Sequence, residues 1–298
     1  MQIADVLQRH KTFSFEVFPP KLDQPIEPLY ETLEQLYTFR PDFISCTYGA
    51  GGTNKGRNTE IVHAIQSSGQ TVALAHFTCI GNTRSDIRAA MEEYQSLGVR
   101  NVLALRGDLP ADWTGTRGDF AHADELIAFV RSLRPDLCVA AAAYPEKHLT
   151  APSLVADIDC LKRKQDNGAA FFMTQLCHDP DAFARFVEQA RAQGITLPIV
   201  AGIMPVLNKD AVIRMAVSNG CSIPAALSCI IGRYGNDPDA FRQAGKEFTA
   251  ASFVRFLNAG ADGLHIYTLN RFKAVSDIIA LSGMRNAPCF GSTSEEQA

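Results

Sequence analysis

The sequence predicts an α/β fold, a single-domain (β/α)8 TIM barrel, and three observations support this prediction. Apolar segments rich in β-forming residues occur eight times along the 298 residues. Amphipathic helical segments lie between them, so strand and helix alternate with a spacing of roughly 30 residues, which is typical of parallel βα units. Eight such units suit this chain length, because a closed barrel of this kind takes about 250 residues.

The predicted strands are short runs of aliphatic, β-branched and aromatic residues. The first, FSFEVF, is ended sharply by Pro19 and Pro20, which cannot continue a strand. In chain order the eight runs span residues 13–18, 42–48, 71–79, 101–107, 137–144, 170–176, 197–204 and 262–268.

The predicted helices are amphipathic and carry start and stop signals. The segment 83–98 opens at a capping Thr83 and closes on Gly98. Similar segments span 25–39, 59–69, 122–133, 153–168, 179–194 and 209–220. The longer interval 221–261 contains a short segment, SIPAALSCII, and a long helix over 238–259, and the last helix follows Asn270.

A doubly wound open sheet is the alternative architecture for alternating strands and helices. It suits the sequence less well, because eight units match a barrel and no GxGxxG motif opens the first helix. No linker or low-complexity stretch divides the chain, so residues 1–290 are expected to form one barrel domain. The polar tail 291–298, GSTSEEQA, is expected to be disordered.

The composition is that of an ordinary soluble protein, with 46% hydrophobic and 20% charged residues. A formal net charge of −4 gives no basic surface for nucleic acid. No apolar run is long enough to span a membrane, and the N-terminal MQIADVLQRH lacks the apolar core of a signal peptide. These observations predict a cytoplasmic protein that neither binds nucleic acid nor spans a membrane.

The eight cysteines are predicted to be reduced structural thiols. The gaps between them are wide and irregular and include no CxxC pair. Cys46, Cys79 and Cys138 fall in apolar runs, where a free thiol behaves as a small hydrophobic group. Cys177 and His178 are adjacent but have no visible further ligands, so no metal site is predicted.

Polar residues stand at the carboxyl ends of all but one of the predicted strands. In a barrel these ends gather at one mouth, where catalytic groups lie, so we expect an active site there. Individual rim residues such as Thr47, Tyr48 and Thr78 could equally have purely structural roles. The strand-end residues are Glu16; Thr47 and Tyr48; His76 and Thr78; Arg106, Gly107 and Asp108; Tyr144, with Glu146 and His148 just beyond; Thr174 and Gln175; and His265, Tyr267 and Thr268, followed by Asn270 and Arg271.

Glu16 is the most informative of these residues. It lies in a run of phenylalanine and valine, where a carboxylate is costly to bury unless it is paired, protonated or directed into a polar site. At the barrel mouth it would meet polar groups from other strands, and the neighbouring phenylalanines would raise its pKa. His265 and Tyr267 are two residues apart, so they share one face of their strand.

Two segments leave alternatives open. The loop 49–58, GAGGTNKGRN, has four glycines and is either a flexible active-site loop or a phosphate cradle, although it lacks the residue order of a P-loop. The basic run 162–164 lies on a predicted helix and is either a solvated face or a contact for an anionic cofactor group. Arg163 and Lys164 would lie near the mouth only if they were close to the start of that helix.

Several motifs together point to a known family. FSFEVFPPK, CTYGAGG, HFTCIG, LALRGDLP, AAAYPEKH, LKRKQDNGA, TQL, GIMP and HIYTLNR occur in the order and spacing of the methylenetetrahydrofolate reductases. Over residues 12–282 the chain resembles this family in its bacterial single-domain form. The resemblance implies an FAD-bearing barrel of one-carbon metabolism and methionine biosynthesis. Such enzymes reduce 5,10-methylenetetrahydrofolate to 5-methyltetrahydrofolate with a hydride from reduced flavin, and they commonly form homo-oligomers.

The resemblance implies catalytic roles for two acidic residues. Glu16 matches the catalytic glutamate, a general acid that helps to open the imidazolidine ring of the folate to an iminium ion. Asp108 matches the aspartate beside flavin and folate. Its negative charge would tune the flavin potential and favour a cationic folate intermediate.

Further positions match cofactor- and substrate-binding residues of the family. On the substrate side, Gln175 matches a contact to the pterin, and Tyr267 and Arg271 match positions implicated in binding folate or nicotinamide. The implied substrate-binding set is Glu16, Tyr48, Gln175, Ile231, Tyr267 and Arg271. The implied FAD-binding set is Thr47, His76, Arg106, Gly107, Asp108, His122, Ala123, Tyr144, His148, Asp157, Arg163 and Lys164.

The chain departs from the family pattern at two positions. In NADH-using members, the position of Ile231 carries an aromatic residue that stacks on substrate or nicotinamide. An aliphatic side chain packs on a ring but cannot π-stack, so NADH, NADPH and a partner electron-transfer protein all stay open as electron donors. Cys160 replaces a polar neighbour of FAD found in some members.

Three functional hypotheses follow from the sequence. The first is a flavin-dependent folate reductase, either reduced directly by NAD(P)H or acting as a subunit that accepts electrons from a partner protein. The second is a flavin-free pterin-binding barrel enzyme, such as a methyltransferase or a lyase. The third is a binding subunit that has lost catalysis, and the presence of Glu16 and Asp108 argues against it.

Overall fold

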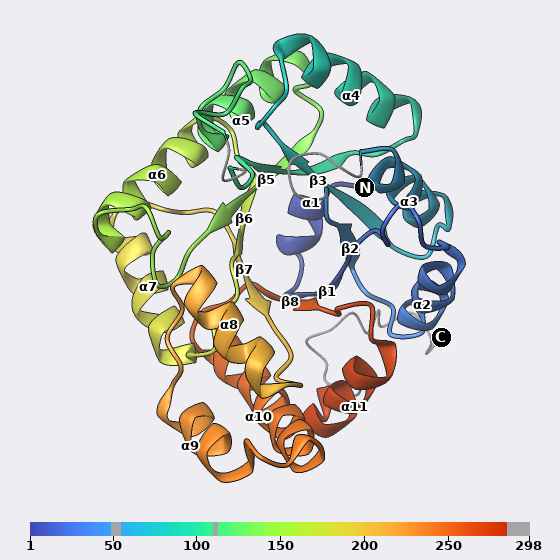
Figure 1. Ribbon diagram of the computed structural model, residues 1–298. Helices are drawn as coiled ribbons and strands as arrows, with labels where there is room; N and C mark the ends of the chain where they lie inside the picture. Colours follow the sequence, from blue (N-terminus) through green and yellow to red (C-terminus); the bar gives the residue numbers. More distant parts are fainter. Residues whose placement is uncertain (49–54, 110–112, 285–298) are drawn as a thin grey trace, which may run out of the picture.

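Eight parallel strands close into a barrel in chain order, with β1 paired to both β2 and β8 (Figure 1). The structure is a computed structural model that describes residues 1–48, 55–109 and 113–284. It confirms the predicted (β/α)8 fold. The strands are β1 (Thr12–Val17), β2 (Phe43–Cys46), β3 (Val72–Thr78), β4 (Asn101–Leu105), β5 (Cys138–Ala143), β6 (Phe171–Thr174), β7 (Ile199–Ile203) and β8 (Gly263–Tyr267).

The helices that follow β1 surround this barrel (Figure 1). Each predicted helix is present, with ends that differ by a few residues from the expected ones. The short segment predicted after residue 221 is a regular helix, α9. The helices are α1 (Ile3–Leu7), α2 (Glu27–Tyr37), α3 (Lys55–Ser67), α4 (Arg84–Ser96), α5 (Ala123–Leu133), α6 (Leu154–Asp166), α7 (Pro180–Ala192), α8 (Lys209–Asn219), α9 (Ala225–Tyr234), α10 (Pro238–Asn258) and α11 (Phe272–Ser282).

Side chains of each strand alternate between the surrounding helices and the barrel lumen. In β1, Phe13, Phe15 and Val17 belong to the main hydrophobic core between the strands and the helices. The alternation turns Ser14 and Glu16 into the lumen, where Ser14 contacts a lumen histidine and Glu16 lines a cavity. The period of two thus separates the apolar and polar halves of this strand.

An apolar layer fills the lumen below the polar groups. It is formed by Phe43, Leu74, Leu103, Cys138, Ala140, Phe171, Met173 and Val200, and Ile3 of α1 packs into it. Figure 1 shows α1 within the ring of strands, where it closes the amino-terminal end of the barrel. The sequence analysis missed α1, because a helix of five residues is too short to show a helical period.

Asn101, the first residue of β4, anchors α1, which plugs the amino-terminal end of the barrel. Its side-chain carbonyl accepts a hydrogen bond from the Ile3 backbone at 2.8 Å, and its amide donates to the carbonyl oxygens of Met1 and Ala73 at 3.2 and 3.3 Å. The residue is fully buried. The bond from Ile3 satisfies a buried backbone amide of α1 that water cannot reach.

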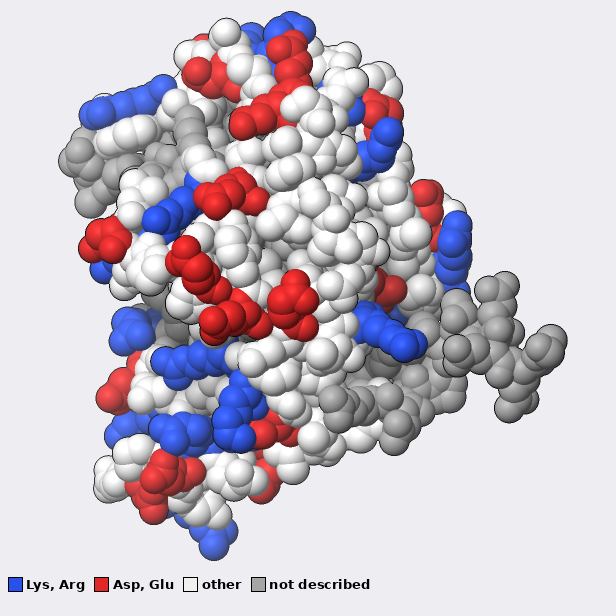
Figure 2. Space-filling view, turned by 90° about the vertical axis from the view of Figure 1, so that its right-hand side faces the viewer, with Lys and Arg blue, Asp and Glu red and all other residues white. Residues whose placement is uncertain are grey.

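The outer surface carries charges of both signs. On the face shown in Figure 2, acidic side chains gather near the middle and basic ones mostly near the edges. Among the helices of the described residues, none combines the length and hydrophobicity needed to cross a membrane. Seven cysteines of the described part of the chain are free, whereas Cys289, the tail 291–298 and most of the loop 49–58 lie outside the described residues.

We expect Asn101→Ala to lower the free energy of unfolding by about 1–3 kcal/mol, because it leaves the buried Ile3 amide without an acceptor. Denaturation with urea would measure the change. Gln2→Ala is the control, since the Gln2 amide donates to the carbonyl oxygen of Asp136 from an exposed position, and the expected change is within about 0.5 kcal/mol. Equal stabilities of the two variants would contradict a plug fastened by Asn101.

Candidate active site

A cavity of about 850 Å³ opens at the carboxyl ends of the strands. Polar residues from β1, β2, β3, β4, β5, β6 and β8 reach it, as the strand-end pattern predicts. Sixteen of the predicted site residues line this cavity. They are Glu16, Thr47, Tyr48, His76, Arg106, Gly107, Asp108, His122, Ala123, Tyr144, His148, Asp157, Arg163, Lys164, Gln175 and Tyr267.

Two predicted substrate-binding residues do not line the cavity. Ile231 lies on α9, where it packs against a separate apolar cluster formed by Val206, Val212, Leu227 and Phe241. Arg271 caps the start of α11 and is exposed, and its backbone amide donates to the carbonyl oxygen of Thr268. Their proposed contacts to substrate stay predictions.

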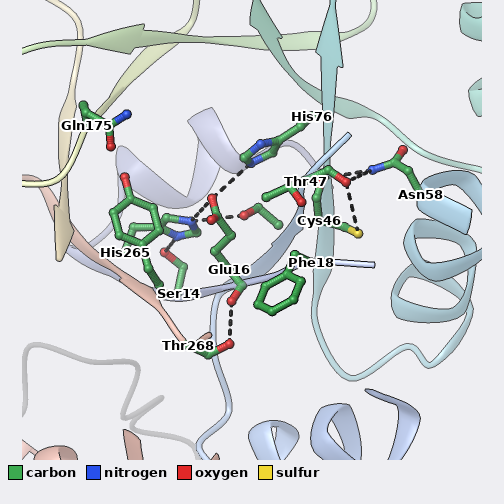
Figure 3. Close-up of polar contacts among 12 residues, drawn as sticks. Ser14, Glu16, Phe18, Cys46, Thr47, Asn58, His76, Gln175, His265 and Thr268 are labelled. Carbon is green, nitrogen blue, oxygen red and sulfur yellow. Dashed lines mark hydrogen bonds and ion pairs between the residues drawn. The ribbon is translucent and has the colours of Figure 1, made fainter. Parts of the chain in front are cut away.

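The Glu16 carboxyl lies between two imidazoles (Figure 3). Its Oε2 atom is 3.6 Å from Nε2 of His76 on β3 and 3.9 Å from Nε2 of His265 on β8. The side chain is 19% exposed, toward the cavity. Burial raises the pKa of Glu16, and the opposing effect of His76 is smaller.

Both imidazoles are neutral near neutral pH. Burial lowers the pKa of His76 to about 4, although Glu16 acts in the opposite direction. Burial lowers the pKa of His265 to about 3. Among the described residues Glu16 therefore forms ion pairs with no permanently charged cation, and it can act as a proton donor closer to neutral pH than an exposed glutamate.

Two of the phenylalanines that were expected to raise the pKa of Glu16 do not face its carboxyl. Phe13 and Phe15 point away from the lumen, into the core beneath the helices. His76 and His265 lie within 4 Å of the carboxyl, and Tyr267 interacts with it electrostatically; these residues come from β3 and β8. The direction of the pKa shift agrees with the prediction, and burial is its cause.

The end of β1 is held in place by the segment after β8. The Thr268 hydroxyl and backbone amide both donate to the carbonyl oxygen of Glu16, at 2.6 and 3.2 Å. The Asn270 side chain donates to the carbonyl oxygen of Phe18 at 2.9 Å and accepts from its amide at 3.2 Å. Asn270 has a φ of +53°, a conformation that asparagine tolerates better than most residues. These contacts fix the backbone that carries Glu16.

Tyr267 crosses the lumen beside Glu16. Its hydroxyl donates to the carbonyl oxygen of Thr174 on β6 at 2.7 Å. Gly202 on β7 makes this possible, because a Cβ at that position would collide with the Tyr267 hydroxyl and with the Thr174 carbonyl. His265 and Tyr267 both face the lumen, as their spacing in the sequence indicates.

Two buried polar atoms beside the cavity have no hydrogen-bond partner among the described residues. They are Nε2 of His76 and Oγ1 of Thr78, and both residues line the cavity. A buried polar group without a partner costs roughly 1–3 kcal/mol. These atoms therefore favour a bound molecule with polar groups at this wall.

Cationic side chains gather on the α6 side of the cavity. Lys164 donates to the carbonyl oxygen of Ala142 at 2.7 Å, and burial lowers its pKa. Arg163 pairs with Asp124 at 3.1 Å and is more than half exposed. Both residues lie in the last turn of α6. The expectation that they could reach the mouth only from the start of this helix was therefore wrong. Their long side chains reach the cavity from there.

Other contacts hold the rim of the cavity. The Asp157 carboxylate accepts a hydrogen bond from the His148 backbone amide at 2.7 Å. The Arg57 guanidinium donates to carbonyl oxygens of Lys21, Leu22 and Gln24, so it holds the loop after β1. Most of the loop 49–58 lies outside the described residues, so both predicted roles of this loop stay predictions.

The sequence analysis missed several residues that line the cavity. Asp124 directly follows the predicted pair His122–Ala123, and Asp159 lies on the same helix as Asp157. A helical period applied to α6 would have joined Asp157 to Cys160 and Lys164, since residues three and four apart share a face. Asp159 is four residues before Arg163, so the same period would have joined it to that predicted residue.

The chain forms a closed (β/α)8 barrel with a polar cavity at the carboxyl ends of its strands, which is where enzymes of this fold have their active sites. The family model described as "Methylenetetrahydrofolate reductase" matches residues 2–283. The chain therefore belongs to the methylenetetrahydrofolate reductase family, whose members are oxidoreductases, and the resemblance seen in the sequence motifs is confirmed.

Similar proteins occur in bacteria and eukaryotes. The chain is 34% identical over 280 residues to the 5,10-methylenetetrahydrofolate reductase of Pectobacterium carotovorum, covering 94% of this chain and 92% of that protein. It is 34% identical over 293 residues to Methylenetetrahydrofolate reductase 1 of Schizosaccharomyces pombe, covering 95% of this chain and 49% of that protein. The chain thus spans about half the length of the curated eukaryotic relatives it matches.

A solved structure has a similar fold at low sequence identity. It is an uncharacterized protein from Clostridium thermocellum that binds two copies of 5-methyl-5,6,7,8-tetrahydrofolic acid. It superposes with a TM-score of 0.62 at 14% identity, covering 96% of this chain and 99% of that chain. At this identity the comparison shows the fold alone.

We expect Gly202→Ala to displace the Tyr267 hydroxyl and to lower the free energy of unfolding by about 1–3 kcal/mol, because the added methyl overpacks the lumen. Tyr267→Phe in the same chain should recover part of this loss, which a double-mutant cycle in urea would measure. The control is Gly232→Ala on α9, where an added Cβ meets no heavy atom within 4 Å. If Tyr267→Phe recovers nothing, the close approach of Gly202 and Tyr267 is not the cause.

Proposed function

We propose that this chain is a flavin-dependent reductase that converts 5,10-methylenetetrahydrofolate to 5-methyltetrahydrofolate. The observation that supports this most is the Glu16 carboxyl, which is buried beside two neutral imidazoles and faces a large polar cavity. Family membership and the 5,10-methylenetetrahydrofolate reductase of Pectobacterium carotovorum point to the same reaction. The folate ligand of the Clostridium thermocellum protein agrees with a folate substrate.

In this proposal Glu16 is the general acid. It donates its proton to the imidazolidine ring of the folate, which opens to a reactive iminium ion. The raised pKa of Glu16 keeps the acid form available, and the neutral histidines do not stabilise the carboxylate. Tyr267 and Gln175 line the same cavity and would position the pterin.

The residues present fit FAD as the cofactor. Nε2 of His76 and Oγ1 of Thr78 are buried without a partner, and the cations Arg106, Arg163 and Lys164 suit a diphosphate. FAD would contact the twelve cavity residues that match the family's flavin positions, and when bound it supplies the hydride. Asp108 would place its negative charge near the reacting groups, where it favours a cationic folate.

The electron donor is either NAD(P)H or an electron-transfer protein. Ile231 packs within the α9 cluster and offers no aromatic ring for a nicotinamide. Anaerobic stopped-flow mixing with NADH and then NADPH distinguishes the donors, because bleaching of the flavin absorbance reports its reduction. Slow or absent bleaching with both nucleotides would point to a protein donor. A colourless protein that cannot be reconstituted with FAD would favour a flavin-free pterin enzyme instead.

We expect Glu16→Gln to keep flavin binding and flavin reduction while slowing folate reduction by about 10²–10⁴-fold, because the amide cannot donate the required proton. The two half-reactions would be measured separately by stopped flow. Glu146→Gln is the matched control, since Glu146 lies outside the cavity lining and accepts a hydrogen bond from the Ser222 amide. A parallel loss of both half-reactions in Glu16→Gln would disprove this role.

The folate half-reaction is also expected to depend on pH. Its rate should fall as the pH rises through the raised pKa of Glu16, because the acid form is then lost. In Glu16→Gln the residual rate should lack this decline. Rates of flavin reoxidation by methylenetetrahydrofolate between pH 5 and 9 would test this, and an unchanged pH profile in the variant would rule Glu16 out as the titrating group.

A further inference from the structure

A buried polar network joins three neighbouring strands beneath Glu16. His265 on β8 has its Nδ1 atom 2.8 Å from the hydroxyl of Ser14 on β1 and its Nε2 atom 3.1 Å from the hydroxyl of Ser45 on β2. The same Nε2 atom is 3.9 Å from Oε2 of Glu16 (Figure 3). Ser14, Ser45 and His265 are fully buried.

The ring orientation of His265 is fixed from several sides. The imidazole stacks on Phe43 with ring centroids 5.5 Å apart and an angle of 14° between the planes. Tyr267 meets it edge-on, with the centroids 5.8 Å apart. Ser14 and His265 are direct register partners of the parallel pair β1–β8. The ring cannot turn without breaking this packing, so Nε2 stays directed at Glu16.

The hydrogen bonds of Ser14 select one tautomer of this ring. The Ser14 hydroxyl also lies 3.1 Å from the carbonyl oxygen of Leu264, which can only accept, so its proton goes there. Ser14 then accepts from His265, which places the ring proton on Nδ1. The Ser45 hydroxyl donates to the unprotonated Nε2. This arrangement satisfies all three contacts, whereas the other tautomer leaves the Leu264 contact without a donor.

The tautomer matters to Glu16 because an imidazole has a dipole. Its negative end lies at the unprotonated nitrogen, and side-chain dipoles act strongly where water is excluded. With the proton on Nδ1, the negative end at Nε2 faces the Glu16 carboxyl and disfavours its ionised form. With the proton on Nε2, the positive end would face Glu16 and favour the carboxylate.

Among the described residues, His76, Tyr267 and Cys46 interact electrostatically with Glu16, and all three are uncharged near neutral pH. His76 on β3 is neutral, as its pKa of about 4 indicates. Burial raises the pKa of Tyr267 on β8 and of Cys46 on β2, so both keep their protons. Burial is the main cause of the raised pKa of Glu16, and the orientation of the neutral dipoles around it adds to or opposes that effect.

We propose that Ser14 is a positioning residue that holds His265 in the Nδ1–H tautomer, so that the imidazole presents its unprotonated Nε2 to Glu16 and keeps that carboxyl in its acid form. The proposal rests on the proposed function, since it explains how the general acid stays protonated between turnovers. It assigns a catalytic consequence to a serine that does not line the cavity.

The tautomer is measured first, by ¹⁵N NMR of the flavin-loaded protein labelled at histidine, without folate. In the two neutral tautomers the ¹⁵N chemical shifts of Nδ1 and Nε2 change places, because the protonated and unprotonated nitrogens differ in shift. The signal that is missing from a His265→Phe sample is that of His265. We expect the Nδ1–H form. A signal of the Nε2–H form in the unmodified protein would overturn the proposal, whether or not any variant folds.

Two matched variants then test the consequence. In Ser14→Ala the acceptor of the Nδ1 proton is gone, so His265 should change to the Nε2–H form. The midpoint of Glu16 protonation should then fall by about 1 pH unit. In Ser45→Ala the Nδ1–H form should persist, and the midpoint should stay or rise. The carboxyl stretch in infrared spectra, taken as a difference against Glu16→Gln, reports this midpoint.

Equal shifts in the two variants would contradict the proposal, because each loses one buried hydroxyl from the same imidazole. Near-ultraviolet circular dichroism shows whether each variant is folded. Neither measurement uses folate reduction. The two proposals can therefore be contradicted separately. Folate reduction retained in Glu16→Gln would contradict the proposed reaction, whereas an Nε2–H signal in the NMR spectrum would contradict the tautomer assignment.

Discussion

The burial of one carboxyl group among neutral polar groups is the constraint on which the site depends. Outside water, an ionised carboxylate is stable only where a cation or several donors compensate for its lost hydration. Around Glu16 the nearest groups are two imidazoles whose own burial keeps them uncharged. Burial therefore shifts the protonation equilibrium of Glu16 toward the acid form, which suits a proton donor.

The layered lumen of the barrel maintains this condition. An apolar floor that includes Phe43 and the plug residue Ile3 keeps water away from the underside of the polar network. Above this apolar layer, His265 forms hydrogen bonds with Ser14 and Ser45, and its ring stacks on Phe43. The cavity begins at Glu16, so desolvation is strong on one side of the carboxyl and substrate reaches it from the other.

Much of the site could be predicted from the order of residues at the strand ends. A parallel barrel brings all carboxyl ends of its strands to one mouth, so polar residues such as His76, Arg106 and Gln175 had to converge there. Residues that reach the cavity from helices were harder to place. Lys164 arrives from the last turn of α6, and Ile231 and Arg271 lie on helices that do not line the cavity.

The sequence by itself determined the eight strands and the helices between them, because periods of two and of three to four residues are local properties of the chain. Only the tertiary structure decided what surrounds Glu16. Its sequence neighbours Phe13 and Phe15 point outward, and its real neighbours, His76 and His265, lie 60 and 249 positions away. Closure of the barrel, by pairing β1 with β8, brings them together.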